Sequence, residues 1–337
     1  MNRFRKQNEQ NIIEYLSGAE KDCPGLIELL YPIVSIASDF IEKLRDYIDF
    51  DFETFEYEKL NISENIKLVR EFLSKEGNGY LENFDKALTD GTFDMFLPEF
   101  LDEEESRSLE PRSCEEDFVN LNIPINNTID DGAAIIHEFF HFTNSEYDMG
   151  TRIIFTEFIS SYMELKYYLF LAEKGYTVDN YYKCLYEKID NTFVAASNVA
   201  FSGGLLDIYE NTGKINRKNI KFIDKFRCLY KPNIKGLINY YSDEDLEEDL
   251  FLFHYDVSYL LGGILAINSL KEPILSDTRI KYINENFDKL SIKDVLNVFE
   301  LDIENFSILI DYCAEKMKEV EGVLNENNSY SGANKRR

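Results

Sequence analysis

The chain has 337 residues, of which 44% are hydrophobic and only 7 are proline, so it can bury a large core and does not have the composition of a disordered protein. Its formal net charge of −27 argues against binding to nucleic acid or to an anionic membrane, because both need a basic face. The five cysteines are scattered, and no apolar segment follows the basic residues near the N-terminus. We therefore expect a cytoplasmic protein with free thiols that does not bind a membrane.

Helical periodicity dominates the chain and predicts a mainly α-helical protein. An acidic run that also contains serine and arginine, at 103–116, is predicted to be a linker or surface loop. It would separate an N-terminal helical lobe, 1–102, from a catalytic domain, 117–324, and the polar residues 325–337 are predicted to form a disordered tail. The segments with the clearest helical spacing are 12–16, 26–48, 66–73, 181–199, 246–270 and 306–323.

A strand pattern precedes the most informative segment of the chain. Residues 118–125 alternate apolar and polar side chains, and Pro124 predicts that this strand lies at the edge of a small sheet. Acidic residues then open a helix, which suits its first turn. An exposed edge strand beside that helix could accept a peptide as an added strand.

Only three histidines occur in the chain, and two of them stand four residues apart in the sequence HEFFH, 137–141. On a helix this spacing places His137 and His141 on one face, one turn apart, with Glu138 beside them. Neutral imidazoles are typical zinc ligands, and a carboxylate next to the metal can act as a general base toward an attacking water. The pattern predicts one Zn²⁺ per chain; the alternative is a pair of ordinary surface or core histidines.

A catalytic zinc needs a third protein ligand and one open position. In a metzincin the third ligand is a histidine six residues after the second one, with a glycine between them. Asn144 and Tyr147 stand at those two places here, so the third ligand is not of the metzincin kind. A helix-like run at 151–165 offers Glu157 and Glu164, which lie on nearly one face. On spacing alone either could be the ligand, and the other could then orient a histidine ring. The apolar neighbours of Glu157 favour it as the ligand, because an acid among apolar residues is costly to bury without a partner.

This part of the chain resembles the thimet oligopeptidase and oligoendopeptidase F group of zinc peptidases. That family carries HEFGH and then a helix with the signature Glu-x-Pro-Ser-Gln-x-x-Glu, whose two glutamates and serine are all present in 157–164. Ile159 and Ser161 replace the proline and the glutamine. The resemblance implies a helical zincin-type metallopeptidase, a gluzincin. It implies as metal ligands His137, His141 and Glu157, with Glu164 and Ser160 supporting them.

Two later segments extend the resemblance over 115–322. Residues 255–266 are similar to a tyrosine- and glycine-bearing helix of the family, and 290–302 are similar to the segment that leads into its last helix. In the family a histidine and tyrosines of that region bind the substrate and stabilise the oxyanion. The candidates here are His254, Tyr255 and Tyr259. His254 either replaces the family's histidine or that role is lost.

The resemblance implies zinc-dependent hydrolysis of peptide bonds in short or unstructured peptides, with Glu138 moving the proton. Two alternatives stay open: a pseudopeptidase that binds a peptide or protein without cleaving it, and a protease dedicated to one protein. Longer members of the family wall off a channel with a helical lobe, so the shorter lobe expected here predicts a shallower cleft. The sequence leaves the oligomeric state open.

Overall fold

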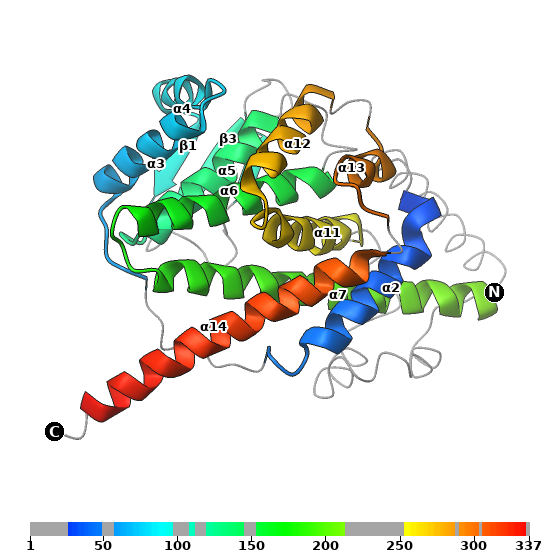
Figure 1. Cartoon of the computed structure of the whole chain (residues 1–337). Coiled ribbons are helices and arrows are strands. Elements are labelled where there is room, and N and C mark those ends of the chain that lie inside the picture. The colour runs from blue at the N-terminus through cyan, green and yellow to red at the C-terminus, as the bar shows by residue number, and fades with distance from the viewer. Residues whose placement is uncertain are drawn as a thin grey trace, which may run out of the picture.

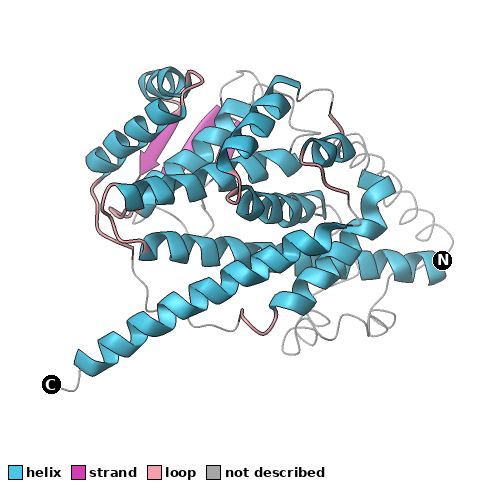
Figure 2. Ribbon diagram, in the orientation of Figure 1, coloured by secondary structure: helices cyan, strands magenta, loops and turns pink. Residues whose placement is uncertain are grey.

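The computed structural model describes residues 26–48, 57–96, 108–111, 119–144, 153–212, 253–286, 290–302 and 305–334. Helices make up most of the described residues, as Figure 2 shows, which confirms the mainly helical class predicted from periodicity. The helix predicted at 12–16, and residues 246–252 of the predicted helix 246–270, lie outside the described residues.

The first part of the described chain forms three helices and a small sheet. The start of the second of these helices is fixed by Asn61, whose side chain accepts a hydrogen bond from the backbone N–H of Glu64. The elements in chain order are α2 (Leu26–Leu44), α3 (Ile62–Glu76), α4 (Tyr80–Thr89), β1 (Phe93–Phe96), β2 (Ser108–Pro111) and β3 (Val119–Pro124).

The sheet has the order β1-β3-β2, so the predicted strand at 118–125 exists but lies in the centre and not at the edge. β1 pairs with β3 in parallel, and β2 pairs with it in antiparallel fashion. Pro124 is the last residue of β3, so its missing N–H removes a ladder hydrogen bond only where the strand ends. Residues 108–111, which were predicted to lie in a linker or surface loop, form β2. Within the described residues, the edge strands are β1 and β2.

The remaining helices carry the candidate site and its supports. α5 packs on β3 and on α6, while α11 packs against both α6 and α7. The long helix α14 crosses in front of α7 and packs against it and α2 (Figure 1). These helices are α5 (Asp130–Asn144), α6 (Ile153–Glu173), α7 (Asp179–Thr212), α11 (Phe253–Ser269), α12 (Pro273–Asn286), α13 (Ile292–Val298) and α14 (Phe306–Asn334).

The C-terminal part of the chain differs from the prediction of a disordered tail at 325–337. α14 continues to Asn334, so 325–334 are helical, while 335–337 lie outside the described residues. Helical hydrogen bonding extends one residue at a time from a helix that is already formed, so polar residues can continue it without an apolar face of their own.

One hydrophobic core joins elements from both sides of the predicted linker. Phe72 of α3 and Tyr167 of α6 meet edge to face with ring centroids 5.4 Å apart, and Phe84 of α4 meets Phe139 of α5 at 5.5 Å. Aromatic pairs of this geometry stabilise a core beyond the area that they bury. The boundaries of two lobes stay a prediction, but the described parts of 1–102 and 117–324 share this core.

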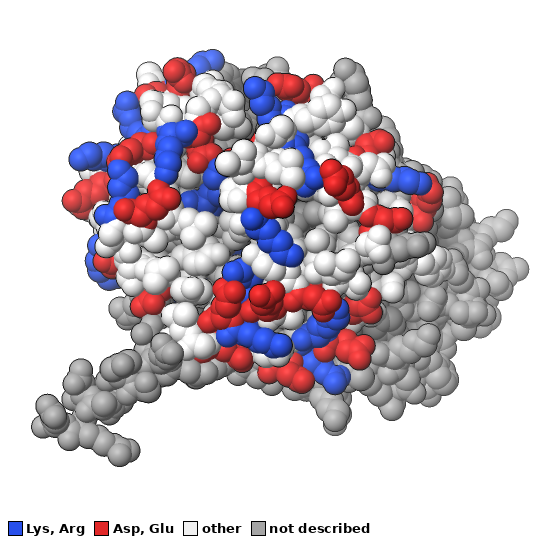
Figure 3. Space-filling view, in the orientation of Figure 1, with Lys and Arg blue, Asp and Glu red and all other residues white. Residues whose placement is uncertain are grey.

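Acidic side chains gather along α14 on the face shown in Figure 3, with lysines placed among them. Asp311 of α14, for example, forms an ion pair with Lys43 of α2.

Among the described residues, no helix combines the length and the apolar character that a bilayer span requires. Cys184 and Cys313 are buried free thiols. The expected cytoplasmic location, and the expectation that the chain binds no nucleic acid, stay predictions.

Candidate metal centre

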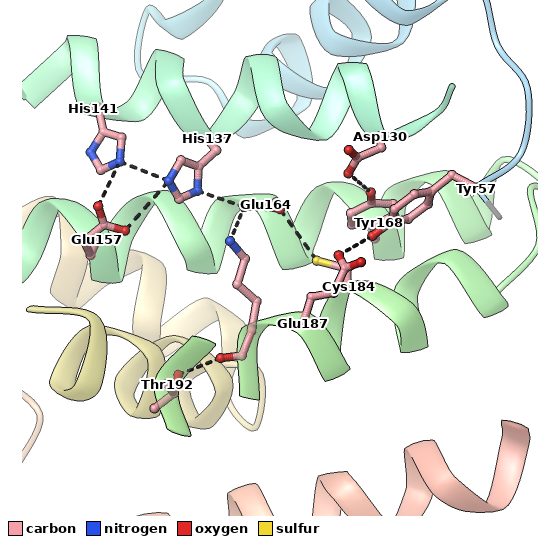
Figure 4. A network of polar contacts seen from close by, with 11 residues as sticks. Tyr57, Asp130, His137, His141, Glu157, Glu164, Tyr168, Cys184, Glu187 and Thr192 are labelled. Atoms are coloured by element: carbon pink, nitrogen blue, oxygen red, sulfur yellow. Dashed lines mark hydrogen bonds and ion pairs between the residues drawn. The ribbon is translucent and has the colours of Figure 1, made fainter. Parts of the chain in front are cut away.

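His137 and His141 lie on one face of α5, as their spacing predicts, and this face is turned toward α6 (Figure 4). Their Nε2 atoms lie 3.0 Å apart. The carboxylate of Glu157 on α6 lies 3.4 Å from His141 Nε2 and 3.8 Å from His137 Nε2. The three side chains are 13–14% exposed, so the cluster is mostly buried but reaches solvent. The structure thus brings together three residues that could hold a metal ion.

The spacing and chemistry of these donor atoms fit zinc. Bonds of about 2.0–2.2 Å to a tetrahedral zinc place its ligand atoms roughly 3.3–3.6 Å apart, and the observed separations of 3.0, 3.4 and 3.8 Å bracket that range. Glu157 Oε2 is buried and has no hydrogen-bond partner among the described residues. A buried carboxylate oxygen is costly without a partner, so this atom indicates a place for a cation.

Opposite charges control the protonation of the cluster. Burial opposes ionisation of Glu157, but His141 and His137, with a contribution from Lys188, lower the pKa of Glu157 to about 2. Burial lowers the pKa of His141 and Glu157 raises it, and the net change in the pKa is upward. Glu157 is therefore ionised at neutral pH, while protons compete with a metal ion for His141.

A glycine and two side-chain hydrogen bonds set the position of α5. A Cβ on Gly132 would lie 2.5 Å from the hydroxyl of Tyr167 and 2.8 Å from Asn65 Oδ1, so a larger residue would push α5 away from α6. Asn65 Nδ2 donates to the carbonyl oxygen of Thr128 at 2.7 Å, and the Asp131 carboxylate accepts from the N–H of Thr128 at 3.2 Å. These contacts fix the start of the helix that carries both histidines.

Glu164 contacts the far side of the His137 ring. Its Oε2 lies 2.8 Å from His137 Nδ1, so the ring donates Nδ1–H to the carboxylate and turns Nε2 toward His141 and Glu157. Burial opposes ionisation of Glu164, but Lys188 and His137 hold its pKa below the ordinary value. The two glutamates, equivalent on spacing alone, therefore differ in position, since only Glu157 faces both Nε2 atoms.

Glu138 lies beside the cluster, whereas Ser160, the serine predicted to support the ligands, forms no side-chain hydrogen bond with it among the described residues. Glu138 is 6% exposed, and its negative charge contributes to the raised pKa of His141. Ser160 is fully buried, and its hydroxyl oxygen has no hydrogen-bond partner among the described residues. A supporting role of Ser160 thus stays a prediction.

The other candidate catalytic side chains come from α11. The charge of Glu157, then burial, and then a hydrogen bond with Glu157 raise the pKa of Tyr259, so this hydroxyl lies at the cluster. Tyr255, one turn earlier, is 43% exposed. His254 lies in α11, but its side chain falls outside the described part of the molecule. The structure therefore brings Tyr259 to the metal centre and leaves the roles of Tyr255 and His254 as predictions.

Gly262 lets α11 approach the site. A Cβ at this position would lie 2.9 Å from the backbone nitrogen of Phe158 and 3.3 Å from the backbone carbon of Glu157. α11 therefore lies directly against the turn of α6 that carries the Glu157 carboxylate. We predict that Gly262→Ala lowers the free energy of unfolding by about 1–3 kcal/mol, because two backbone segments would have to separate. Chemical denaturation measures this change.

Gly322→Ala is the matched control for this prediction. Gly322 lies in α14, and no atom lies within 4 Å of the place that its Cβ would occupy. Alanine favours a helix over glycine, so we expect unchanged stability or a gain of up to about 1 kcal/mol. Equal effects of the two substitutions would show that close packing at Gly262 is not needed.

Lys188 of α7 is the charged neighbour of the site that the sequence interpretation missed. Its Nζ lies 2.6 Å from Glu164 Oε2, and its side chain is 15% exposed. The sequence spacing could have indicated that Lys188 is mostly buried. Tyr181, Leu185 and Thr192 lie on the same helix face as Lys188, and all three are buried. A lysine on such a face needs an acidic partner.

A comparison with solved structures finds PZ peptidase A, determined with inhibitor 2. The alignment has a TM-score of 0.56 and 16% sequence identity and covers 89% of this chain and 57% of that chain. The chain thus spans a little over half the length of that peptidase. No family model matches the chain, and no curated protein matches its sequence. The likeness shows the fold alone: the chain has the mainly helical fold of that peptidase, in agreement with the fold that the resemblance in its sequence implies, and it does not assign the chain to the oligoendopeptidase F group.

Proposed function

We propose that the chain is a zinc-dependent peptidase that hydrolyses peptide bonds in short or unstructured peptides. The proposal depends on one observation, the convergence of His137, His141 and Glu157 at metal-binding distances from one another. Glu138, buried beside His141, supplies a carboxylate next to the place of the metal. The fold that the chain shares with a peptidase supports the same function.

The zinc would be held by Nε2 of His137, Nε2 of His141 and the carboxylate of Glu157. When bound, it would supply Lewis-acid chemistry, polarising the scissile carbonyl and lowering the pKa of the attacking water. Glu138 would accept a proton from that water and pass it to the leaving amine. Glu164 would keep His137 in the orientation that directs its Nε2 to the site.

Tyr259 is the best-placed residue to stabilise the oxyanion. A donor at that position must keep its proton. The pKa of Tyr259 is raised from an ordinary value that already lies well above neutral pH, so its hydroxyl is protonated. Its side chain is 43% exposed while it also reaches Glu157, so it can contact a substrate at the mouth of the site. Tyr255 and His254 are the further candidates for substrate contacts.

Hydrolysis of a library of quenched fluorescent peptides tests this function. We expect cleavage that is abolished by a chelator and restored by zinc. Cleavage that survives complete metal removal would overturn the proposal. A protein that binds zinc and peptides but cleaves none would instead be the pseudopeptidase, and cleavage of one protein without any library peptide would identify a dedicated protease.

A further inference from the structure

One oxygen of Glu164 joins three helices. Oε2 lies 2.8 Å from His137 Nδ1 of α5 and 2.6 Å from Lys188 Nζ of α7. The other oxygen, Oε1, accepts a weak hydrogen bond from Cys184 Sγ at 3.7 Å. The Glu164 side chain is only 7% exposed, so water replaces these partners poorly. Lys188 is the partner with a full positive charge, and no step of the proposed reaction uses it.

We propose that Lys188 is a positioning residue of the metal centre, which holds the Glu164 carboxylate where it orients the His137 ring. This inference rests on the metal site of the proposed function. Lys188 would touch neither substrate nor metal. Its direct contact with the site is Glu164, and its charge also contributes to the lowered pKa of Glu157 from a longer distance. Burial lowers the pKa of Lys188, but Glu164, Cys184 and Glu157 together raise it by more, so the net pKa is raised and the lysine is charged.

The charges around the site support this role. The carboxylates of Glu138, Glu157 and Glu164 bring three negative charges into surroundings that are mostly buried. A divalent cation and the Lys188 ammonium would together balance them. Without Lys188, the Glu164 carboxylate would remain as an uncompensated charge, which is costly in a buried position.

Removal of the Lys188 charge has two opposing effects on metal binding. Loss of direct repulsion between the ammonium and a dication favours binding, but the Glu164 carboxylate pairs with Lys188 and cancels most of that repulsion. The second effect is larger: an unpaired Glu164 no longer keeps its place, and the Nδ1–H of His137 loses its anionic acceptor. Zinc should therefore bind more weakly, by about the 10- to 100-fold typical for residues that orient a metal ligand.

Zinc affinity, measured by competition with a chromophoric chelator, tests the proposal. We expect Lys188→Met to bind zinc about 10- to 100-fold more weakly than wild type. Lys188→Arg keeps the charge and should recover most of the affinity. Lys183→Met is the matched control, because Lys183 lies on the same helix, is also 15% exposed and pairs with Glu187 instead. It should leave zinc affinity unchanged.

Two further readouts separate positioning from a general structural role. In a Glu164→Gln background, Lys188→Met should cause little additional loss, because its partner is already removed. In the cobalt-substituted protein, Lys188→Met should change the visible absorption bands that report ligand geometry, while Lys183→Met should not. If Lys188→Met does not fold, Lys188→Gln provides the same comparisons with a donor that carries no charge.

Wild-type affinity or tighter binding in Lys188→Met would overturn the role of Lys188. An equal loss with and without Glu164 would do the same. If the variants differ in zinc affinity as expected but wild type cleaves no peptide, the proposed function fails and the role of Lys188 stands. A wild-type protein that binds no zinc overturns both.

Discussion

Glu138→Gln is expected to lower kcat for peptide hydrolysis by about 100- to 10,000-fold and to leave zinc bound. The amide has nearly the shape of the carboxylate but cannot accept the proton of the attacking water. Glu138 is not one of the three clustered donors, so the metal site should persist. The measurement pairs initial rates on a cleaved library peptide with the zinc content of the same samples.

Glu82→Gln is the control for this substitution. Glu82 lies in α4 and is exposed, so it undergoes the same chemical change away from the site. We expect wild-type kcat and wild-type zinc content for this variant. A Glu138→Gln protein that retains wild-type kcat would exclude Glu138 as the general base, and loss of its zinc would point to a structural role.

Glu157→Ala is expected to weaken zinc binding by more than about 100-fold, and Glu164→Ala by only about 10- to 100-fold. The reason is positional, because Glu157 faces the Nε2 atoms of both histidines whereas Glu164 contacts only Nδ1 of His137. Chelator competition, with circular dichroism to verify folding, measures both. Glu157→Gln keeps an oxygen donor of similar shape and should fall between wild type and the alanine variant.

Glu173→Ala provides a control on the same helix. Glu173 is an exposed residue of α6 that pairs with Lys75, so its loss changes the charge of the helix without touching the cluster. Its zinc affinity should equal that of wild type. The opposite order for Glu157 and Glu164 would mean that Glu164 is the ligand and that the two acids exchange roles when metal binds.

Periodic patterns allowed several of the helices and the strand β3 to be predicted from sequence, but not α4 or α12. Helical spacing predicted α2, α6, α7 and α14, and strand alternation predicted β3. The position of β3 in its sheet could not be read from Pro124, because a proline at the last residue of a strand is compatible with a central strand as well as an edge. The partners β1 and β2 are short and carry little pattern of their own.

The part of the candidate site that could be predicted directly from sequence is the part whose residues are close together in the chain. The i, i+4 spacing of His137 and His141 determines their common face on any helix. Glu157 and Glu164 could not be distinguished by spacing, because the distinction depends on how α6 lies across α5. Lys188 comes from a third helix, and only the packing of α7 shows which acid it meets.

Zinc content per chain tests the metal centre most directly. Purified wild-type protein would be dialysed with zinc and then against metal-free buffer, and its metal measured by atomic emission beside a His137→Ala/His141→Ala variant. We predict one zinc per wild-type chain and none in the variant, because two of the three clustered donors are then missing. Wild-type protein without stoichiometric zinc, or equal zinc in the variant, would contradict the proposed site.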